Sequence, residues 1–284
     1  MGQLMDRQKA RLEIRGRNKP AGQVTRGKTA QNRLRRVDTY LLLAERYLIG
    51  RREGPFARAL FADVGYGAEP FTTLESAARL RRVNPTLPVL GVEIEGERVA
   101  AALPYADQHT HFRLGGFNLP LHPGEHIRLI RAFNVLRQYE EPAVTEAWRL
   151  MGQHLLPGGL LIEGTSDPFG QVWVANLVRK QTNNTLLLEG LLFSTNFRPG
   201  FAPEQFQPVL PKNFIHRVVL GEPIEQFFRQ WHQAYRETLP YRVWGVRQHF
   251  VQTARRLGEM GVKVGLRPRL LREGFLVVTA PSFI

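Results

Sequence analysis

Cysteine is absent from this chain of 284 residues. Its absence excludes disulfides, zinc sites built on thiolates, and every mechanism that uses a cysteine nucleophile. Long hydrophobic runs are also missing: apolar runs such as LLLEGLLF, residues 186–193, are far shorter than the roughly 20 residues of a membrane span. The N-terminus lacks the apolar stretch of a signal peptide. We therefore expect a soluble, cytoplasmic protein.

The charge is distributed unevenly along the chain. Residues 1–60 hold 15 lysines and arginines against 5 acids, a net charge of +10, and residues 240–284 hold 8 against 2, a net charge of +6. The total of +14 leaves the central body near neutral, at −2. Two basic ends suit a polyanion contacted through its phosphates, although an arginine-rich composition without a binding role explains the same counts.

A phosphate-binding pattern occurs near the N-terminus. The stretch AGQVTRGKTAQ holds Gly22, Gly27, Lys28 and Thr29 at the spacing of a P-loop. That loop works only between a buried strand and the N-terminus of a helix. The preceding RLEIRGRNKP contains only two large apolar residues, so no buried strand can form there. We interpret the segment as part of a basic, solvated arm.

The arm leads into a helical pattern. Between residues 32 and 50, apolar residues recur at steps of three and four, which predicts an amphipathic helix. Arginines lie on or beside its polar side, and a further basic loop, PKNFIHR, follows much later in the chain. The candidates for contact with an anionic substrate are Arg33, Arg35, Arg36 and Lys212.

Short apolar runs and helical patterns alternate over residues 58–163, which predicts a parallel sheet with helices on its faces. The next two apolar runs, VWVANLVRK and TLLLEGLLF, are separated by too few residues for a crossover helix, so we expect an antiparallel hairpin at one edge. Two helical patterns and two β-like runs follow. The stripe of Phe227, Phe228, Trp231 and Tyr235 is typical of a buried helix face. The predicted fold class is doubly wound α/β.

A glycine-containing loop, DVGYGAEP, follows the first predicted strand and precedes a helix. Gly65 and Gly67 let a ligand approach the backbone, and the helix N-terminus presents free N–H groups. In open α/β sheets, the crevice at the strand ends is the expected ligand site. A dinucleotide fingerprint needs a third glycine where Pro70 stands, and an S-adenosylmethionine (SAM) loop usually has one where Glu69 stands. Both ligands remain candidates on the loop alone.

The second predicted strand, within LPVLGVEIE, ends in a carboxylate. Glu93 lies at the strand terminus, about as far after the loop as the acid that holds a ribose diol. An ionised side chain there can accept both hydroxyl hydrogen bonds. We place Glu93 ahead of its neighbour Glu95 because the ribose position is at the strand end.

Residues 58–195 resemble the class I SAM-dependent methyltransferases. The resemblance rests on the ordered series LFADVGYGAE, VLGVEIEGERVAAA, FRLGGFNLP, LIRAFNVLRQY and EAWRLMGQHLLPGGLLIEG, followed by the hairpin. With VTRGKTAQNRLRRVD included, the chain is similar to a bacterial subgroup of unassigned substrate. The resemblance implies a mostly parallel, seven-stranded, Rossmann-like sheet that ends in an antiparallel hairpin.

The resemblance also implies SAM as the cofactor and a set of residues around it. The positions that match the family's cofactor-binding positions are Asp63, Gly65, Gly67, Glu69, Glu93, Phe117 and Asn118. The first three would border the methionine moiety, and Glu93 would hold the ribose. Asn134, at the end of the fourth strand, would approach the methyl-donor region. In this sequence, GGFN replaces the acid that often holds the adenine amine. We therefore expect adenine to be held by packing against Phe117, by Asn118 or by backbone groups.

Several chemistries receive less support. The histidines His109, His111, His122 and His126 lack a convergent third ligand, so we expect no metal. The chain has no D/N-P-P-Y/F after the fourth strand, which argues against methylation of exocyclic base amines. A hydroxyl, a ring nitrogen, a carboxylate or a small amine remains as the acceptor atom. Glu163, at the end of the fifth predicted strand, is either a residue at the lip of the site or part of a polar loop.

We expect three regions: a basic arm and amphipathic helix (1–57), a SAM-binding core (58–200), and an extension packing on the core as a substrate lid or nucleic-acid surface (201–284). The leading hypothesis is a SAM-dependent methyltransferase acting on nucleic acid, with RNA as the favoured polyanion partner and no membrane contact. One alternative is a methyltransferase of the same fold that acts on a small molecule. Another is a catalytically inactive nucleic-acid-binding protein.

Overall fold

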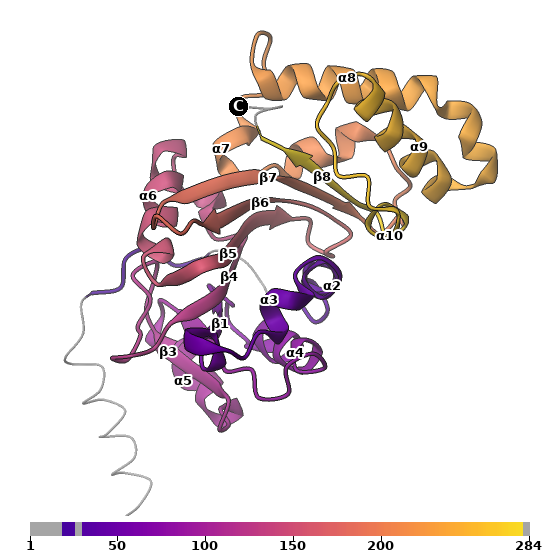
Figure 1. The fold of residues 1–284 in the computed structure, drawn as a ribbon. Helices are drawn as coiled ribbons and strands as arrows, with labels where there is room; N and C mark the ends of the chain where they lie inside the picture. Colours follow the sequence, from indigo (N-terminus) through magenta and orange to yellow (C-terminus); the bar gives the residue numbers. More distant parts are fainter. Residues whose placement is uncertain (1–18, 26–29, 281–284) are drawn as a thin grey trace, which may run out of the picture.

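The computed structural model describes residues 19–25 and 30–280. Within these residues, eight strands form one sheet in the order β3-β2-β1-β4-β5-β6-β7-β8 (Figure 1). The strands are β1 (Leu60–Val64), β2 (Val89–Glu93), β3 (Thr110–Leu114), β4 (Ile127–Phe133), β5 (Leu155–Ser166), β6 (Val172–Lys180), β7 (Leu186–Thr195) and β8 (Phe275–Thr279).

The first five strands pair in parallel, and β6, β7 and β8 continue the sheet in antiparallel pairs. The doubly wound, mostly parallel fold and its antiparallel hairpin are therefore confirmed. The expected count of seven strands is wrong, because GFLVVTA pairs with β7 as an eighth strand. A strand that is separated in sequence from its partner by about 80 residues leaves no local signal of the pairing.

Helices cover both faces of the sheet. The α-helices are α2 (Arg35–Ala44), α3 (Arg46–Gly50), α4 (Phe71–Leu80), α5 (Gly96–Ala102), α6 (Glu141–Gly152), α7 (Lys212–Ile215), α8 (Pro223–Glu237), α9 (Val246–Glu259) and α10 (Pro268–Arg272). Short 3₁₀ helices are η1 (Gly54–Ala57), η2 (Leu103–Tyr105), η3 (Leu136–Gln138), η4 (Pro203–Val209) and η5 (Leu239–Trp244). Figure 1 shows α2, α3 and α4 on one side of the sheet and α8 and α9 on the other.

Alternate strand residues supply separate cores on the two faces. Phe61 and Leu129 pack in the cluster that contains the apolar side of α2, whereas Ala62 and Ile130 pack in the cluster that contains α6. This alternation follows from the two-residue period of a strand.

The predicted helix over 32–50 is confirmed as a helical region, but it breaks at Glu45 into α2 and α3.

The aromatic stripe of α8 forms a third core with β6, β7 and β8. Phe227, Phe228 and Trp231 are buried, and Tyr235 packs against them half-buried. The interpretation of this stripe as core is confirmed.

In the described part of the chain, no helix combines the length and apolar character needed to cross a membrane. Of the P-loop pattern, Gly27, Lys28 and Thr29 lie outside the described residues.

Candidate functional site

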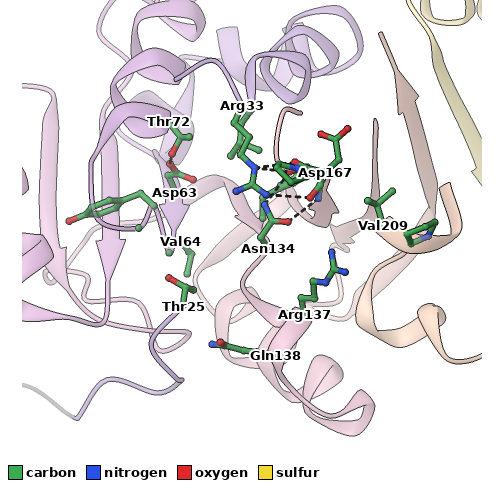
Figure 2. Close-up of a pocket in the computed structure, with 18 residues that line it drawn as sticks. Thr25, Arg33, Asp63, Val64, Thr72, Asn134, Arg137, Gln138, Asp167 and Val209 are labelled. Carbon is green, nitrogen blue, oxygen red and sulfur yellow. Dashed lines mark hydrogen bonds between the residues drawn. The ribbon is translucent and has the colours of Figure 1, made fainter. Parts of the chain in front are cut away.

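A pocket of about 730 Å³ lies at the carboxyl ends of β1, β4 and β5. From β1 the strand order continues outward through β2 and β3, and from β4 it continues in the opposite direction through β5, so the strand order reverses between β1 and β4. Open α/β sheets bind ligands at such a switch point. Gly65, Asn134 and Ser166 bring the three strand ends to the pocket, and Thr25 and Arg33 reach it from the N-terminal segment (Figure 2).

The loop after β1 has the geometry that its glycines permit. Gly65 and Gly67 have φ angles of +72° and +90°, which side-chain-bearing residues rarely adopt. A Cβ atom at Gly65 would lie 2.7 Å from Cγ2 of Val135. Glycine is therefore required at position 65 both for backbone conformation and for the close approach of the loop that follows β4.

Glu93 fixes this loop to the end of β2. Its Oε2 accepts a hydrogen bond from the backbone N–H of Gly67 at 2.9 Å, and its Oε1 accepts one from Ile94 at 2.9 Å. Its side chain is buried, and Nη1 of Arg98 lies 3.7 Å from Oε1. The structure thus brings together two features that sequence analysis assigned separately, the glycine loop and the strand-end carboxylate.

Asp63 lies at the wall of the same pocket, but its carboxylate is directed to other groups. It accepts hydrogen bonds from Nε and Nη2 of Arg131 at 2.9 and 2.7 Å and from the Thr73 hydroxyl at 2.7 Å. The Thr72 hydroxyl donates a further bond at 3.3 Å. Asp63 therefore joins β1 to β4 and to the first turn of α4, behind the glycine loop.

Asn134 follows β4 directly, in a left-handed conformation with φ of +61°. Its side-chain amide donates to Oγ of Ser166 at 3.1 Å, and its Oδ1 accepts from the backbone N–H of Ser166 at 2.9 Å. Asn134, which the resemblance places near the methyl-donor region, thus lines the pocket and ties the end of β4 to the end of β5.

Two arginines, Arg33 and Arg137, line the pocket. Arg33 donates from Nε to Oγ of Ser166 and to the carbonyl oxygen of Asp167, both at 3.2 Å, and Arg137 lines the same pocket (Figure 2). Burial lowers the pKa of Arg33; the carboxylate of Asp167 opposes this effect, and the charge of Arg137 adds to it. The Asp167 carboxylate itself accepts backbone hydrogen bonds from the turn before β6.

The N-terminal segment Lys19–Thr25, here called the strap, crosses the crevice beside this pocket. The strap contacts the loop after β3, where Phe117 N–H donates to the carbonyl of Ala21 at 2.8 Å. The side chain of Asn118 accepts from Ala21 N–H at 2.9 Å and donates to the carbonyl of Lys19 at 3.2 Å. Phe117 and Asn118, the residues left for adenine, are thus paired with the strap.

The other half of the strap is held by residues that sequence analysis did not select. Gln138 donates to the carbonyls of Gln23 and Val24 at 3.3 and 3.0 Å, and Arg98 donates to the hydroxyl and carbonyl of Thr25 at 3.1 and 3.2 Å. Neither Gln138 nor Arg98 belongs to a recognisable sequence motif. Only their places just after β4 and on α5, the helix after Glu93, mark them as neighbours of the crevice.

The remaining substrate candidates lie elsewhere. Arg36 donates to Oγ of Ser194 and to the carbonyl of Glu273, and its guanidinium lies 4.5 Å from the ring centroid of Phe275. It therefore joins α2 to the sheet. Arg35 is exposed and does not line the pocket, and Lys212 lies on α7 with its Nζ 3.1 Å from Nε2 of His216. Glu69, one of the predicted cofactor-binding residues, is also exposed and does not line the pocket.

Glu163 is neither a lip nor a loop residue. It lies within β5, its side chain is buried, and Asn176 of β6 donates to it at 2.7 Å. The strand extends to Ser166, beyond the predicted end, because its last residues pair with β6. Among the described residues, no group of three or more His, Asp or Glu side chains is arranged to hold a metal ion.

No protein-family model matches this chain, and no curated protein matches it. Solved structures that resemble it include magnesium protoporphyrin IX methyltransferase (ChlM) from Synechocystis PCC 6803 with bound SAH, at 16% identity and a TM-score of 0.35, over 47% of this chain and 54% of that chain. The N-methyltransferase NodS from Bradyrhizobium japonicum WM9 matches at 17% identity and a TM-score of 0.31, over 47% of this chain and 68% of that chain. LepI in complex with SAM matches at 17% identity and a TM-score of 0.33, over 43% of this chain and 30% of that chain.

These likenesses are partial. In each of the three, less than half of this chain is matched, and the chain spans about half of ChlM and about a third of LepI.

Proposed function

We propose that this protein is a SAM-dependent methyltransferase. The observation that carries the proposal is the contact between Gly67 N–H and Glu93 at 2.9 Å. It joins a left-handed glycine loop and a buried carboxylate at the switch point of a doubly wound sheet, next to a pocket of about 730 Å³. A nucleoside placed across the strand ends meets backbone at the loop and an acceptor for its ribose hydroxyls at Glu93.

The residues of the site have distinct roles in this proposal. Bound SAM would supply an activated methyl group on its sulfonium for in-line transfer to an acceptor atom, with SAH as the leaving group. Gly65 and Gly67 admit the ligand close to the backbone, and Glu93 orients the ribose. Asn134 lies where the reacting groups meet, with its amide already fixed by Ser166. Positioning of this kind can supply much of the acceleration without a dedicated acid or base.

For the acceptor we propose a nucleic acid, with RNA favoured. The corner formed by η5 carries two exposed aromatic rings, Tyr241 and Trp244, whose centroids are 5.5 Å apart. Arg236, Arg242 and Arg247 are exposed beside or within this corner. Exposed aromatic rings with neighbouring arginines suit the stacking and phosphate contacts of single-stranded nucleic acid.

A small-molecule acceptor is the alternative, and a different observation favours it. Pro208 and Val209 of η4 line the pocket opposite the glycine loop, so the extension after residue 200 narrows access to Asn134. A pocket of about 730 Å³ falls within the usual range of small-ligand sites. RNA binding that strengthens with falling salt, together with methylation of RNA, would favour the first acceptor class over the second.

Calorimetric titration of SAM and S-adenosylhomocysteine (SAH) tests the proposal. Glu93→Gln should weaken binding of both ligands by about tenfold or more, because hydrogen bonds to a charged group are each worth about 1.5–3 kcal/mol. Glu97→Gln, an exposed glutamate on α5, is the matched control and should leave the affinity unchanged. Absence of SAM and SAH binding to the folded protein would instead support a noncatalytic nucleic-acid-binding protein.

A further inference from the structure

The strap fills the part of the crevice that an adenosine moiety needs. The cavity left between the strap, Gly65, Glu93 and Phe117 measures about 20 Å³, which holds about one water molecule. A Cβ atom built on Gly116 would lie 2.0 Å from the carbonyl oxygen of Ala21. No nucleobase can lie against this loop while the strap is there.

The strap also occupies the hydrogen-bonding groups of the loop. Phe117 N–H is a donor, and the Asn118 amide offers an acceptor oxygen. The carbonyl and N–H of Ala21 satisfy this pair at 2.8 and 2.9 Å. Adenine presents the same combination on its Watson–Crick edge, an acceptor ring nitrogen beside an amino donor. The backbone of Ala21 therefore offers the loop what adenine would offer it.

The neighbouring pocket is open at the same time. It measures about 730 Å³ and is lined by Gly65, Gly67 and Asn134, which are proposed to border the methionine moiety and the reacting groups. Occlusion is thus confined to the adenosine half of the crevice. Thr25, at the end of the strap, lines both spaces and marks the boundary between them.

We propose that the strap is a built-in competitor of the cofactor, and that the adenosine moiety binds only when Lys19–Thr25 leaves the crevice. This inference rests on the proposed function, because it takes the occluded ligand to be SAM or SAH. The apparent affinity for either ligand is then reduced by the fraction of molecules in which the strap is seated. Loosening the strap should strengthen binding without changing any residue of the core that the ligand contacts.

Gly22→Val is the variant that tests this. Gly22 has a φ of +140°, and a Cβ atom there would lie 3.1 Å from Oη of Tyr139, so valine should unseat the strap. We expect SAH and adenosine to bind at least about threefold more tightly to Gly22→Val than to the wild type. Gly261→Val is the matched control, because Gly261 also has a positive φ, +90°, but faces open space far along the chain. Weaker binding to Gly22→Val alone would overturn the proposal, because the strap would then be part of the ligand's site.

Hydrogen exchange of the wild-type protein supplies a second, independent readout. The N–H groups of Ala21 and Gln23 donate to Asn118 and Tyr139, and saturating adenosine should speed their exchange. Methionine, which lacks the nucleoside, should not. Retained or increased protection with SAH bound would overturn the strap proposal while leaving the proposed function intact. Failure of SAH to bind either the wild type or Gly22→Val would overturn both.

Discussion

Burial changes the pKa of the Glu163 carboxyl group. It lies within β5 with 1% of its surface exposed, and burial raises its pKa from 4.5 to about 7, while the hydrogen bond from Asn176 acts in the opposite direction. Its neighbours form a polar group inside the fold, in which Asn176 also donates to Asn213 of α7 at 3.0 Å. A neutral carboxyl is therefore the form that suits this position.

Glu163→Gln should make stability less dependent on pH. Between pH 4.5 and about 7 the folded protein keeps a proton that the unfolded chain has lost, so the wild type loses stability as pH rises through this range. Glutamine carries no charge, and its oxygen can still accept from Asn176. The variant should exceed the wild type by up to about 3 kcal/mol at pH 8 and by little near pH 4.5.

Urea unfolding at the two pH values measures this difference. Glu146→Gln, on the exposed side of α6, is the control and should follow the wild type at both. Equal pH dependence in Glu163→Gln and the wild type would show that Glu163 is ionised in the folded protein throughout this range.

At the scale of elements, a buried ionic group attaches helix α2 to the sheet. Arg131 of β4 lies 2.9 Å from a carboxylate oxygen of Asp38 on α2 and 2.7 Å from one of Asp63 on β1. The Ser76 hydroxyl of α4 donates to Asp38 at 2.7 Å. One guanidinium thus holds together two strands and two helices directly behind the glycine loop.

Arg131→Met should destabilise the fold by about 3–5 kcal/mol, because it leaves the buried carboxylate of Asp63 without a counter-charge and Asp38 with Arg79 alone. Arg149→Met, which removes an exposed ion pair with Glu146, should change the unfolding midpoint little. Unfolding of both variants in guanidinium chloride measures their free energies of unfolding, which are then compared with that of the wild type. Equally small effects would mean that Asp38 and Asp63 take up protons or water at little cost once Arg131 is gone.

At the scale of the whole molecule, the two ends of the chain are structurally connected. β8, near the C-terminus, completes the sheet, and Arg36 of α2 bonds to Glu273, 237 residues away in sequence. The extension after residue 200 therefore shares its core with the sheet. We expect the described residues to unfold with the extension and the sheet as one cooperative unit.

RNA binding provides the prediction at this scale. For about five phosphate contacts, the affinity for single-stranded RNA should fall on the order of a hundredfold between 50 and 200 mM salt. Arg242→Gln should reduce the slope of log affinity against log salt by about 0.7, because it removes one phosphate contact. Trp244→Ala should weaken binding but leave this slope unchanged. Fluorescence anisotropy at several salt concentrations measures both. A flat salt dependence would argue against a phosphate-contacting surface and favour the small-molecule acceptor.

Local patterns in the sequence determined the doubly wound sheet, the glycine loop and the place of Glu93. Each depends on residues near one another in the chain: apolar periodicity for strands and helices, glycine for a left-handed turn, and a carboxylate at a strand end. The rule that ligands bind at the strand ends then located the crevice. The roles assigned to individual site residues stay predictions: cofactor binding by Asp63, Gly65, Gly67, Glu69, Glu93, Phe117 and Asn118, and the place of Asn134 in the methyl-donor region.

Only the tertiary structure decided how the distant parts meet. Asp63 and Arg131 are 68 residues apart, and Ala21 and Asn118 are 97 apart. Neither contact leaves a repeating pattern in the sequence, because each joins single polar groups across the fold. The pairing of β8, the burial of Glu163 and the seating of the strap in the crevice arise in the same way, from long-range packing and the need to pair buried polar groups.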